Sequence, residues 1–208
     1  MGIMKKFFSQ TKKPEGFLGK IMVNGMNSGG HASLAEWGLG FIGNKRAQVS
    51  LDCGCGGGAN VRRLLERSDK AYGIDYSEIS VAKSRQTNAG AIRRGKCEII
   101  RGDVCSLPFE NVSFDIVTAF ETVYFWQNIE KAFSEIYRVL KKGGVFAITN
   151  ESTGTDKTSV KFSRIIDGMN LYTGDDMKAL LEKAGFAGIE IHTHTDKPWL
   201  TVTAKKAE

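Results

Sequence analysis

The sequence contains few of the residues that build covalent cross-links, metal sites or membrane spans. It has only 3 prolines and 4 cysteines among 208 residues. The cysteines form no C-x-x-C pair and no histidine lies near them in sequence, so we expect reduced thiols and no metal site. No apolar run approaches the roughly 20 residues that cross a bilayer, and no apolar segment follows the charged start. We therefore expect a cytoplasmic protein with no membrane span and no signal peptide.

Basic residues outnumber acidic ones, but they are not concentrated in a binding motif. The 29 Lys and Arg residues and 23 Asp and Glu residues give a formal net charge of +6. The charges are spread along the chain, and the densest basic cluster lies within residues 5–20. Such a cluster is typical of a solvated surface, so we expect no nucleic-acid partner. A chain of this length is enough for one domain with a large core.

Glycine is abundant, with 24 residues, and its central cluster lies at residues 54–58. The pattern Asp-x-Gly-x-Gly-x-Gly, residues 52–58, separates an apolar segment at 49–53 from a helical pattern at 60–67. Glycine has no Cβ atom, so its backbone can take positive φ and approach a ligand closely. The helix that follows presents its free N–H groups to the same ligand. We therefore expect a nucleotide-like molecule to lie across this loop.

Two kinds of nucleotide fit such a loop. The spacing Gly54-x-Gly56-x-x-Ala59, followed by an acid at Asp75, satisfies the dinucleotide fingerprint. The carboxylate of Asp52, on the last residues of the strand, would however repel a diphosphate and attract an ammonium or sulfonium group. The Asp52 carboxylate therefore favours a cationic adenosyl compound over a dinucleotide.

Apolar segments alternate with helical patterns along most of the chain. The expected strands are residues 49–53, 71–75, 97–101, 114–120, 145–149, 189–193 and 199–204. Near-continuous apolar strands alternating with helices predict a parallel sheet covered on both faces. The last two strands flank a short turn and predict an antiparallel hairpin. The expected fold class is therefore α/β: a doubly wound, seven-stranded, mostly parallel sheet with an antiparallel C-terminal hairpin and helices on both faces.

The chain is expected to divide into an N-terminal helical extension, residues 1–45, and a main domain, residues 46–208. The extension carries helical patterns at 14–22 and 31–42, separated by glycine-rich breaks. It could serve as a lid over the site or pack against the edge of the sheet. Residues 151–170 are polar and weakly periodic, which predicts a mobile loop or a substrate-facing insertion.

Acidic residues stand where four of the expected strands end. Asp52 and Asp75 end the first two strands, Asp103 follows the third, and Glu121 follows the fourth. In an open α/β sheet, ligands bind at the carboxyl ends of the strands near the switch point. Asp75 is placed to accept hydrogen bonds from both hydroxyls of a ribose. The simpler explanation for Asp75 and Asp103 is that each caps the turn that follows it.

Together these motifs resemble those of class I S-adenosylmethionine (SAM) methyltransferases. The resemblance runs from about residue 47 onward and includes residues 52–58, 102–109, 114–117, 139–144 and 172–186. It implies SAM as the cofactor, with the Asp after the third strand accepting the adenine amino group and the next residue's backbone meeting the ring. The residues expected at the cofactor are Asp52, Cys53, Gly54, Cys55, Gly56, Asp75, Tyr76, Asp103, Val104 and Phe120.

The sequence departs from the family pattern in two places. Lys142 stands where the family usually has a proline before paired glycines, and residues 122–124 stand where many relatives carry a histidine. The second departure leaves the catalytic residue open. Glu121, Tyr124 and His31 are the candidates for a base, and His31 qualifies only if the extension folds over the site.

The resemblance implies methyl transfer to an O, N, S or C nucleophile of a small molecule. Nucleic-acid amino methyltransferases typically place Asp/Asn-Pro-Pro-aromatic after the fourth strand, whereas residues 120–124 contain no proline. Tyr124, Phe125, Trp126 and Trp37 indicate either an apolar substrate pocket or ordinary core. Two other functions stay open: an NAD-dependent oxidoreductase and a SAM-binding regulator without transferase activity. The oligomeric state is not indicated.

Overall fold

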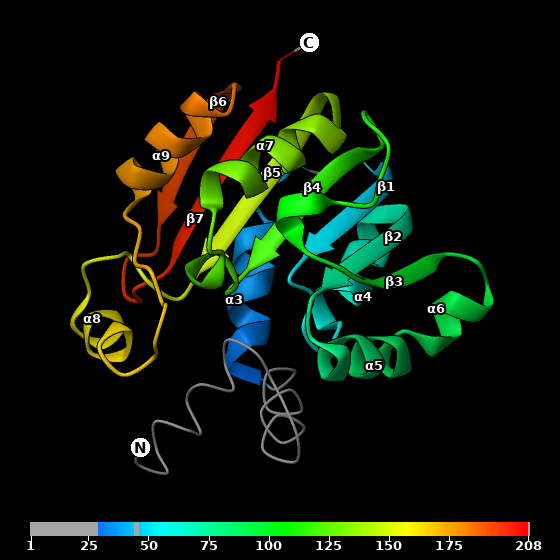
Figure 1. Ribbon diagram of the computed structural model, residues 1–208, viewed down its shortest axis with the longest axis horizontal. Helices are drawn as coiled ribbons and strands as arrows, with labels where there is room; N and C mark the ends of the chain where they lie inside the picture. Colours follow the sequence, from blue (N-terminus) through cyan, green and yellow to red (C-terminus); the bar gives the residue numbers. More distant parts are fainter. Residues whose placement is uncertain (1–28, 44–45, 208) are drawn as a thin grey trace.

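A seven-stranded sheet forms the centre of the molecule (Figure 1). The structure, a computed structural model, describes residues 29–43 and 46–207, so the helix expected at residues 14–22 lies outside the described residues. The strands are β1 (Ala47–Cys53), β2 (Ser68–Asp75), β3 (Cys97–Arg101), β4 (Phe114–Phe120), β5 (Leu140–Asn150), β6 (Phe186–Thr193) and β7 (Leu200–Lys206). Their order is β3-β2-β1-β4-β5-β7-β6; β7 pairs antiparallel with both β5 and β6, and the other neighbouring strands pair in parallel. The predicted fold class, including the reversed strand beside β5, is confirmed.

Helices cover both faces of this sheet. They are α3 (Gly29–Leu39), α4 (Ala59–Arg67), α5 (Glu78–Thr87), α6 (Ala89–Arg93), α7 (Ile129–Val139), α8 (Lys157–Ser163) and α9 (Gly174–Lys183), with short 3₁₀ turns η2 (Val104–Ser106) and η3 (Val123–Phe125). One core includes Phe133 and Met177 from α7 and α9, and a second core includes Leu39 and Val61 from α3 and α4. Two separate cores, one on each face, are what a doubly wound sheet requires.

Helix α7 shows why the sequence forms these elements. Its apolar residues recur at helical spacing and are all buried: Ile129, Ala132, Phe133, Ile136 and Val139. Asn128 caps the helix, because its side chain accepts a hydrogen bond from the Lys131 N–H. Each large apolar side chain buried in this way contributes about 1.5–3 kcal/mol. Because α7 connects the end of β4 to the start of β5, its packing on the sheet holds these two strand ends in place.

The topology brings the ends of four strands together. From β1 the chain winds outward through β2 to β3, and it then returns to β4, which pairs with the other side of β1. The switch point of the sheet therefore lies between β1 and β4, where the two crossovers diverge and leave a crevice. In Figure 1, α8 and α5 lie on opposite sides of this end of the sheet, with α3 between them in the view.

Two local features differ from the predictions, and the position of α3 bears on a choice that the sequence left open. Strand β5 begins at Leu140, because the glycine pair expected to end a helix forms an irregular stretch of the strand, with Gly143 at φ +71°. The segment 151–170, expected to be a mobile loop or a substrate-facing insertion, contains a short helix, α8, which is capped by Asp156. Helix α3 packs against β5, where Gly38 approaches Thr149 so closely that a Cβ atom would lie 2.2 Å from the Thr149 hydroxyl. Among the described residues, no helix is long and apolar enough to cross a bilayer.

Candidate cofactor and substrate site

The glycine loop between β1 and α4 has the backbone geometry that only glycine adopts easily. Gly54, Gly56 and Gly58 have φ values of +73°, +48° and +82°. A Cβ atom on Gly54 would lie 2.1 Å from the Thr122 hydroxyl, so this residue must be glycine for packing reasons. A Cβ atom on Gly56 would meet nothing within 4 Å, because this residue faces the cavity described below. The loop thus offers a bare backbone surface to a ligand at Gly56.

Asp75, at the end of β2, lies directly beneath this surface. Its carboxylate accepts hydrogen bonds from the backbone N–H of Gly56 at 2.9 Å and of Ser77 at 2.8 Å. The residue is 8% exposed, and burial raises its pKa against the opposing effect of these bonds. The carboxylate also has a hydrogen bond with the Ser80 side chain, and we expect its remaining acceptor capacity to bind the ribose hydroxyls. Ser77 caps α5, as the sequence predicts.

Asp52 and Cys53 lie deeper than the sequence suggests. Both are buried in β1 and are not among the residues that line the cavity. The Asp52 carboxyl accepts a hydrogen bond from the Thr118 hydroxyl at 2.8 Å. Burial raises the pKa of Asp52 to about 7, partly offset by this bond and increased by the nearby Asp75. Asp52 is therefore hydrogen-bonded to β4 and does not face the cavity, and its expected role at the cofactor stays a prediction.

The end of β3 supplies the second ligand-facing region. Asp103 accepts a hydrogen bond from the Cys105 N–H at 2.9 Å and so caps η2. Both Asp103 and the buried Val104 line the cavity, and Tyr76 lies on the same cavity with 41% of its surface exposed. A capping role and a role in adenine binding are compatible, because the second oxygen of Asp103 makes no bond to the Cys105 N–H.

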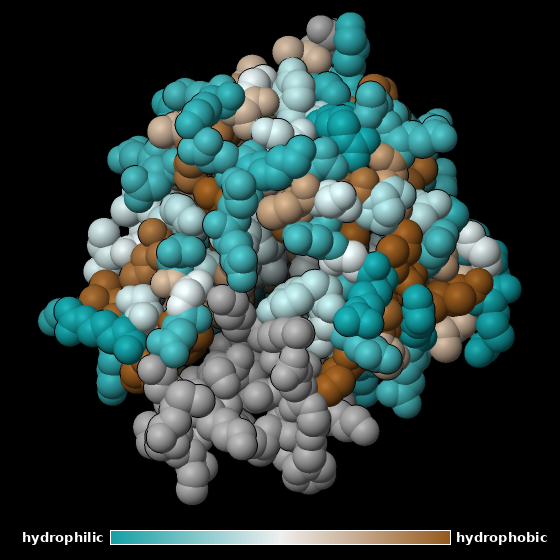
Figure 2. Space-filling model, in the orientation of Figure 1, coloured by the Kyte–Doolittle hydropathy of each residue, from teal (hydrophilic) through white to brown (hydrophobic). Residues whose placement is uncertain are grey.

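One cavity of about 950 Å³ joins these regions. Its volume lies at the upper end of the roughly 300–1,000 Å³ typical of small-molecule sites. The predicted site residues that line it are Gly54, Cys55, Gly56, Asp75, Tyr76, Asp103, Val104, Phe120, Glu121, Tyr124 and His31. Figure 2 shows a mainly hydrophilic surface broken by small groups of hydrophobic residues on the face that it draws.

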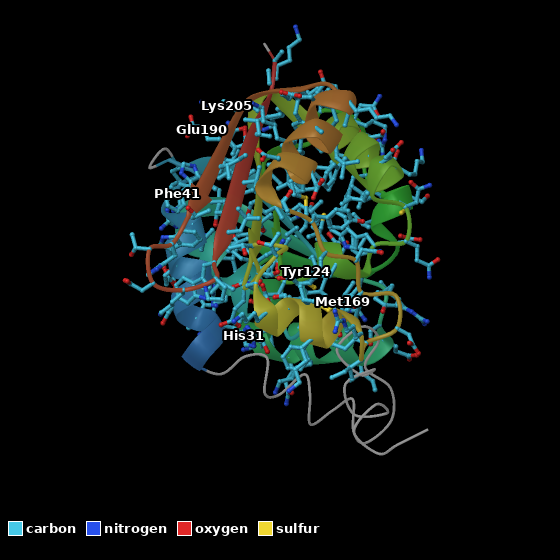
Figure 3. The ribbon with its side chains drawn as sticks, turned by 90° about the vertical axis from the view of Figure 1, so that its left-hand side faces the viewer. His31, Phe41, Tyr124, Met169, Glu190 and Lys205 are labelled. Carbon is cyan, nitrogen blue, oxygen red and sulfur yellow. The ribbon has the colours of Figure 1, made fainter. Side chains whose placement is uncertain are left out.

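Beyond Phe120 the cavity continues into a second region, here called the acceptor lobe. It is formed by the segment after β4, by α8 and the turn that follows it, and by the start of α3. Its lining residues are His31, Glu121, Tyr124, Phe125, Glu151, Thr158, Ser159, Phe162, Ile166 and Met169. Figure 3 shows His31, Tyr124 and Met169 around α8 at one end of the molecule, away from Phe41, Glu190 and Lys205.

Glu121 is the most constrained acid in the acceptor lobe. Its backbone takes φ +57°, which is uncommon for a residue with a side chain. Its Oε1 accepts hydrogen bonds from the Tyr124 hydroxyl at 2.8 Å and from the backbone N–H of Glu151. Burial raises the pKa of Glu121 to about 7, and burial with the adjacent Glu121 raises the pKa of Tyr124 well above its usual value. Glu121 is thus placed to hold or release a proton near neutral pH.

His31 and Glu151 approach Glu121 from two other elements. An imidazole nitrogen of His31 and one carboxylate oxygen from each glutamate lie within 4.8 Å of one another. The indole N–H of Trp199 donates to Glu151 at 3.5 Å. An imidazole and two carboxylates are also ligand types for a divalent metal, and the sequence-based expectation of no metal site stays a prediction.

Sequence reasoning missed part of the acceptor lobe. Glu151 directly follows β5 and could have been found by the rule that identified acids after the other strands. Phe162, Ile166 and Met169 belong to the polar segment 151–170, where the short helix α8 gave too little periodicity to predict which residues face inward. Conversely, the structure brings together all three candidate bases, His31, Glu121 and Tyr124, which the sequence places far apart or leaves unoriented.

The strand order, the glycine loop and the acids at the ends of β2, β3 and β4 match those expected for the class I SAM-dependent methyltransferase fold. Typical NAD-binding sheets instead end in parallel strands, and the antiparallel β7 separates the two classes. Residues 51–148 match the family described as "Methyltransferase domain". The matched segment runs from β1 into β5 and contains the glycine loop, Asp75, Asp103 and Glu121.

Relatives and solved structures agree with this assignment. The chain is 29% identical over 180 residues to 24-methylenesterol C-methyltransferase 2 of Arabidopsis thaliana, covering 80% of this chain and 50% of that protein. It is also 29% identical over 179 residues to the uncharacterized methyltransferase YdaC of Bacillus subtilis, covering 84% and 92%. The chain spans about half the length of the sterol methyltransferases it matches.

The fold is shared with solved methyltransferase structures at low sequence identity. A putative methyltransferase in complex with the Trm112 activator from Haloferax volcanii has a TM-score of 0.77 at 19% identity, covering 90% of this chain and 94% of that chain. Phosphoethanolamine N-methyltransferase 2 of Haemonchus contortus, in complex with SAM, has a TM-score of 0.73 at 20% identity, covering 85% and 53%.

Proposed function

We propose that this chain transfers a methyl group from SAM to an O, N, S or C nucleophile of a small molecule. The observation that carries the proposal is the single cavity, which joins the glycine loop and Asp75 to the acceptor lobe around Glu121. The residues fit the adenosyl group: the bare backbone at Gly56 allows close approach, and Asp75 can accept two hydroxyls. When bound, SAM supplies a methyl group already activated on a sulfonium centre.

The residues of the chain would then act by positioning and by proton transfer. Asp75 orients the ribose, and Asp103 and Val104 orient the adenine. Holding the reactants in line accounts for a large part of such catalysis. Glu121, with Tyr124 as its hydrogen-bond donor, can accept a proton from a nucleophile that must lose one. Residues of α3 and α8 line the cavity and limit the access of water.

Several further features of the function belong to the same proposal. We propose that the chain divides into an N-terminal extension, residues 1–45, and a SAM-binding domain, residues 46–208, and that α3 of the extension forms one wall of the site, because this helix both packs on β5 and lines the cavity. A small-molecule substrate, without a nucleic-acid partner, is supported by the sterol methyltransferases among the relatives. A cytoplasmic location is supported by the four cysteines, which are all free thiols.

Calorimetric titration with SAM, S-adenosylhomocysteine and NAD tests the proposal against an NAD-dependent oxidoreductase. We expect both adenosyl compounds to bind and NAD to give no heat. Tight binding of NAD with no response to SAM would refute the proposal. Incubation with SAM labelled on its methyl group and a metabolite extract then separates a transferase from a regulator, because a regulator binds SAM but transfers no label.

A further inference from the structure

We propose that the acceptor lobe selects an organic ammonium ion: an apolar or aromatic molecule that carries an amine. The inference rests on the proposed function and narrows its substrate class. It is carried by three features of the lobe: its charge, its surplus of hydrogen-bond acceptors, and the apolar surface beside them.

The first feature is negative charge inside a basic protein. Among the residues that the structure describes, the charged side chains that line the cavity are the acids Asp75, Asp103, Glu121 and Glu151 and one arginine, Arg63. Arg63 is held by an ion pair with Glu36 at 2.9 Å. Within the acceptor lobe, the described lining residues include no lysine or arginine opposite the two glutamates, although the chain has a net charge of +6. A cation is therefore attracted to this lobe and an anionic substrate is repelled.

The second feature is that the lobe has more acceptors than donors. Within the described chain, both hydrogen bonds to the Glu121 carboxylate are accepted by Oε1. This leaves Oε2 for a donor of the ligand. The Tyr124 hydroxyl already donates to Glu121, and Glu151 places a second carboxylate within 4.8 Å of Glu121, with His31 beside it. An ammonium group brings up to three donors, a hydroxyl brings one, and a carboxylate brings none.

The third feature is an apolar surface next to the carboxylates. Tyr124, Phe125, Phe162, Ile166 and Met169 line the same lobe, and Tyr124 and Ile166 are each 5% exposed. Aromatic faces attract cations as well as apolar groups. A hydrated metal ion could use the carboxylates and His31, but it would leave this surface uncovered. The apolar surface thus favours an organic cation over a metal as the occupant.

The test compares three probes that share one aromatic body: phenethylamine, 2-phenylethanol and 3-phenylpropionate. Each is titrated calorimetrically into the full chain, saturated with S-adenosylhomocysteine and in the presence of EDTA, near neutral pH. We expect the amine to bind at least about tenfold more tightly than the alcohol, since the ammonium adds a full positive charge to the hydrogen bond that each of the two probes donates to a carboxylate. The carboxylate should bind more weakly than the alcohol.

Variants then locate the preference. Glu121→Gln and Glu151→Gln should each reduce the affinity for phenethylamine about tenfold and change the affinity for 2-phenylethanol much less. Glu182→Gln is the matched control, because Glu182 is exposed on α9, outside the cavity lining, and it should change neither affinity. Glu151 is also exposed, so its variant tests the inference even if the Glu121 variant does not fold.

Three outcomes would overturn the inference. Equal affinities for the amine and the alcohol, including no binding of either, would show that charge does not select the ligand. A preference that survives both glutamine variants would place the ammonium elsewhere. Binding of MnCl₂ alone that is lost in Glu151→Gln and displaces the amine would assign the glutamates to a metal. Binding of S-adenosylhomocysteine is recorded in every case, so its absence identifies a failure of the proposed function itself.

Discussion

Removing the Asp75 carboxylate gives the sharpest test of how the cavity holds SAM. In Asp75→Ala, two charge-assisted hydrogen bonds to the ribose disappear, each contributing about 1.5–3 kcal/mol. The loss of about 3 kcal/mol or more raises the Kd for S-adenosylhomocysteine on the order of 100-fold. Asp75→Asn keeps one acceptor oxygen and should lie between the wild type and the alanine variant. Calorimetric titration measures all three affinities.

A second effect of the same substitution must be separated from the first. Asp75 also accepts hydrogen bonds from Gly56 and Ser77, so its loss leaves two backbone N–H groups without this acceptor and loosens the glycine loop. Adenosine and 2′,3′-dideoxyadenosine distinguish the two effects. The wild type should prefer adenosine, because only adenosine has both hydroxyls, whereas Asp75→Ala should bind the two compounds alike.

The matched control is Asp69→Ala. Asp69 lies near the start of the same strand, is exposed, and pairs with Arg46 at 2.8 Å. Its removal should leave the affinity for S-adenosylhomocysteine unchanged. If a folded Asp75→Ala protein binds this compound as tightly as the wild type, or still prefers adenosine, then the ribose lies elsewhere and the reasoning is wrong.

Three further predictions concern the loop, the buried acid and a helix cap. Gly56→Ala should lower the free energy of unfolding by about 1–2 kcal/mol, because alanine is strained at φ +48°; chemical denaturation measures this effect. The same substitution should weaken binding of S-adenosylhomocysteine, measured by calorimetry, because the methyl group of the alanine enters the cavity. Glu121 has a pKa raised from 4.5 to about 7, so the stability that it contributes is complete below pH 4.5 and is lost as the pH rises through about 7. By linkage, the free energy of unfolding falls over this range by an amount on the order of 3 kcal/mol. Glu121→Gln should remove this part of the pH dependence, which urea unfolding at several pH values measures. Thr173→Ala removes the capping box that starts α9 and should lower the free energy of unfolding by about 1 kcal/mol without changing the affinity for S-adenosylhomocysteine. A larger change in binding free energy than in unfolding free energy would show that α9 contributes to the cofactor site.

The strands were predictable from the sequence where their apolar pattern is continuous and both ends are marked. The segments 97–101 and 114–120 match β3 and β4 in full, because charged or turn-forming residues bound both of them. Strand β5 was predicted too short. A glycine pair ordinarily indicates a turn, but here the neighbouring β4 continues to pair past the irregularity, at Phe114 and Leu140. The pairing of β4 with β5, which cannot be predicted from the local sequence pattern, sets the start of β5.

The cofactor half of the site followed from the sequence more completely than the acceptor lobe. Asp75 and Gly56 are positioned by a strand end and by a loop whose geometry glycine dictates, and both are local features. Phe162 and Met169 belong to a segment whose placement depends on distant partners, such as the hydrogen bond from the Asn170 N–H to the Tyr124 carbonyl at 2.8 Å. Contacts of this kind, across more than 40 positions in the chain, cannot be read from periodicity.

The insertion of β7 between β5 and β6 has a consequence for the order in which the molecule is assembled. Strand β6 is made before β7, yet it cannot join the sheet until residues 200–206 have been synthesised and have paired with β5. During that interval the apolar edge of β5 is open to pairing with another chain, which is the usual start of aggregation. Yield during translation should therefore depend on how fast the last strand docks, and a chain shortened before residue 200 should accumulate as insoluble protein.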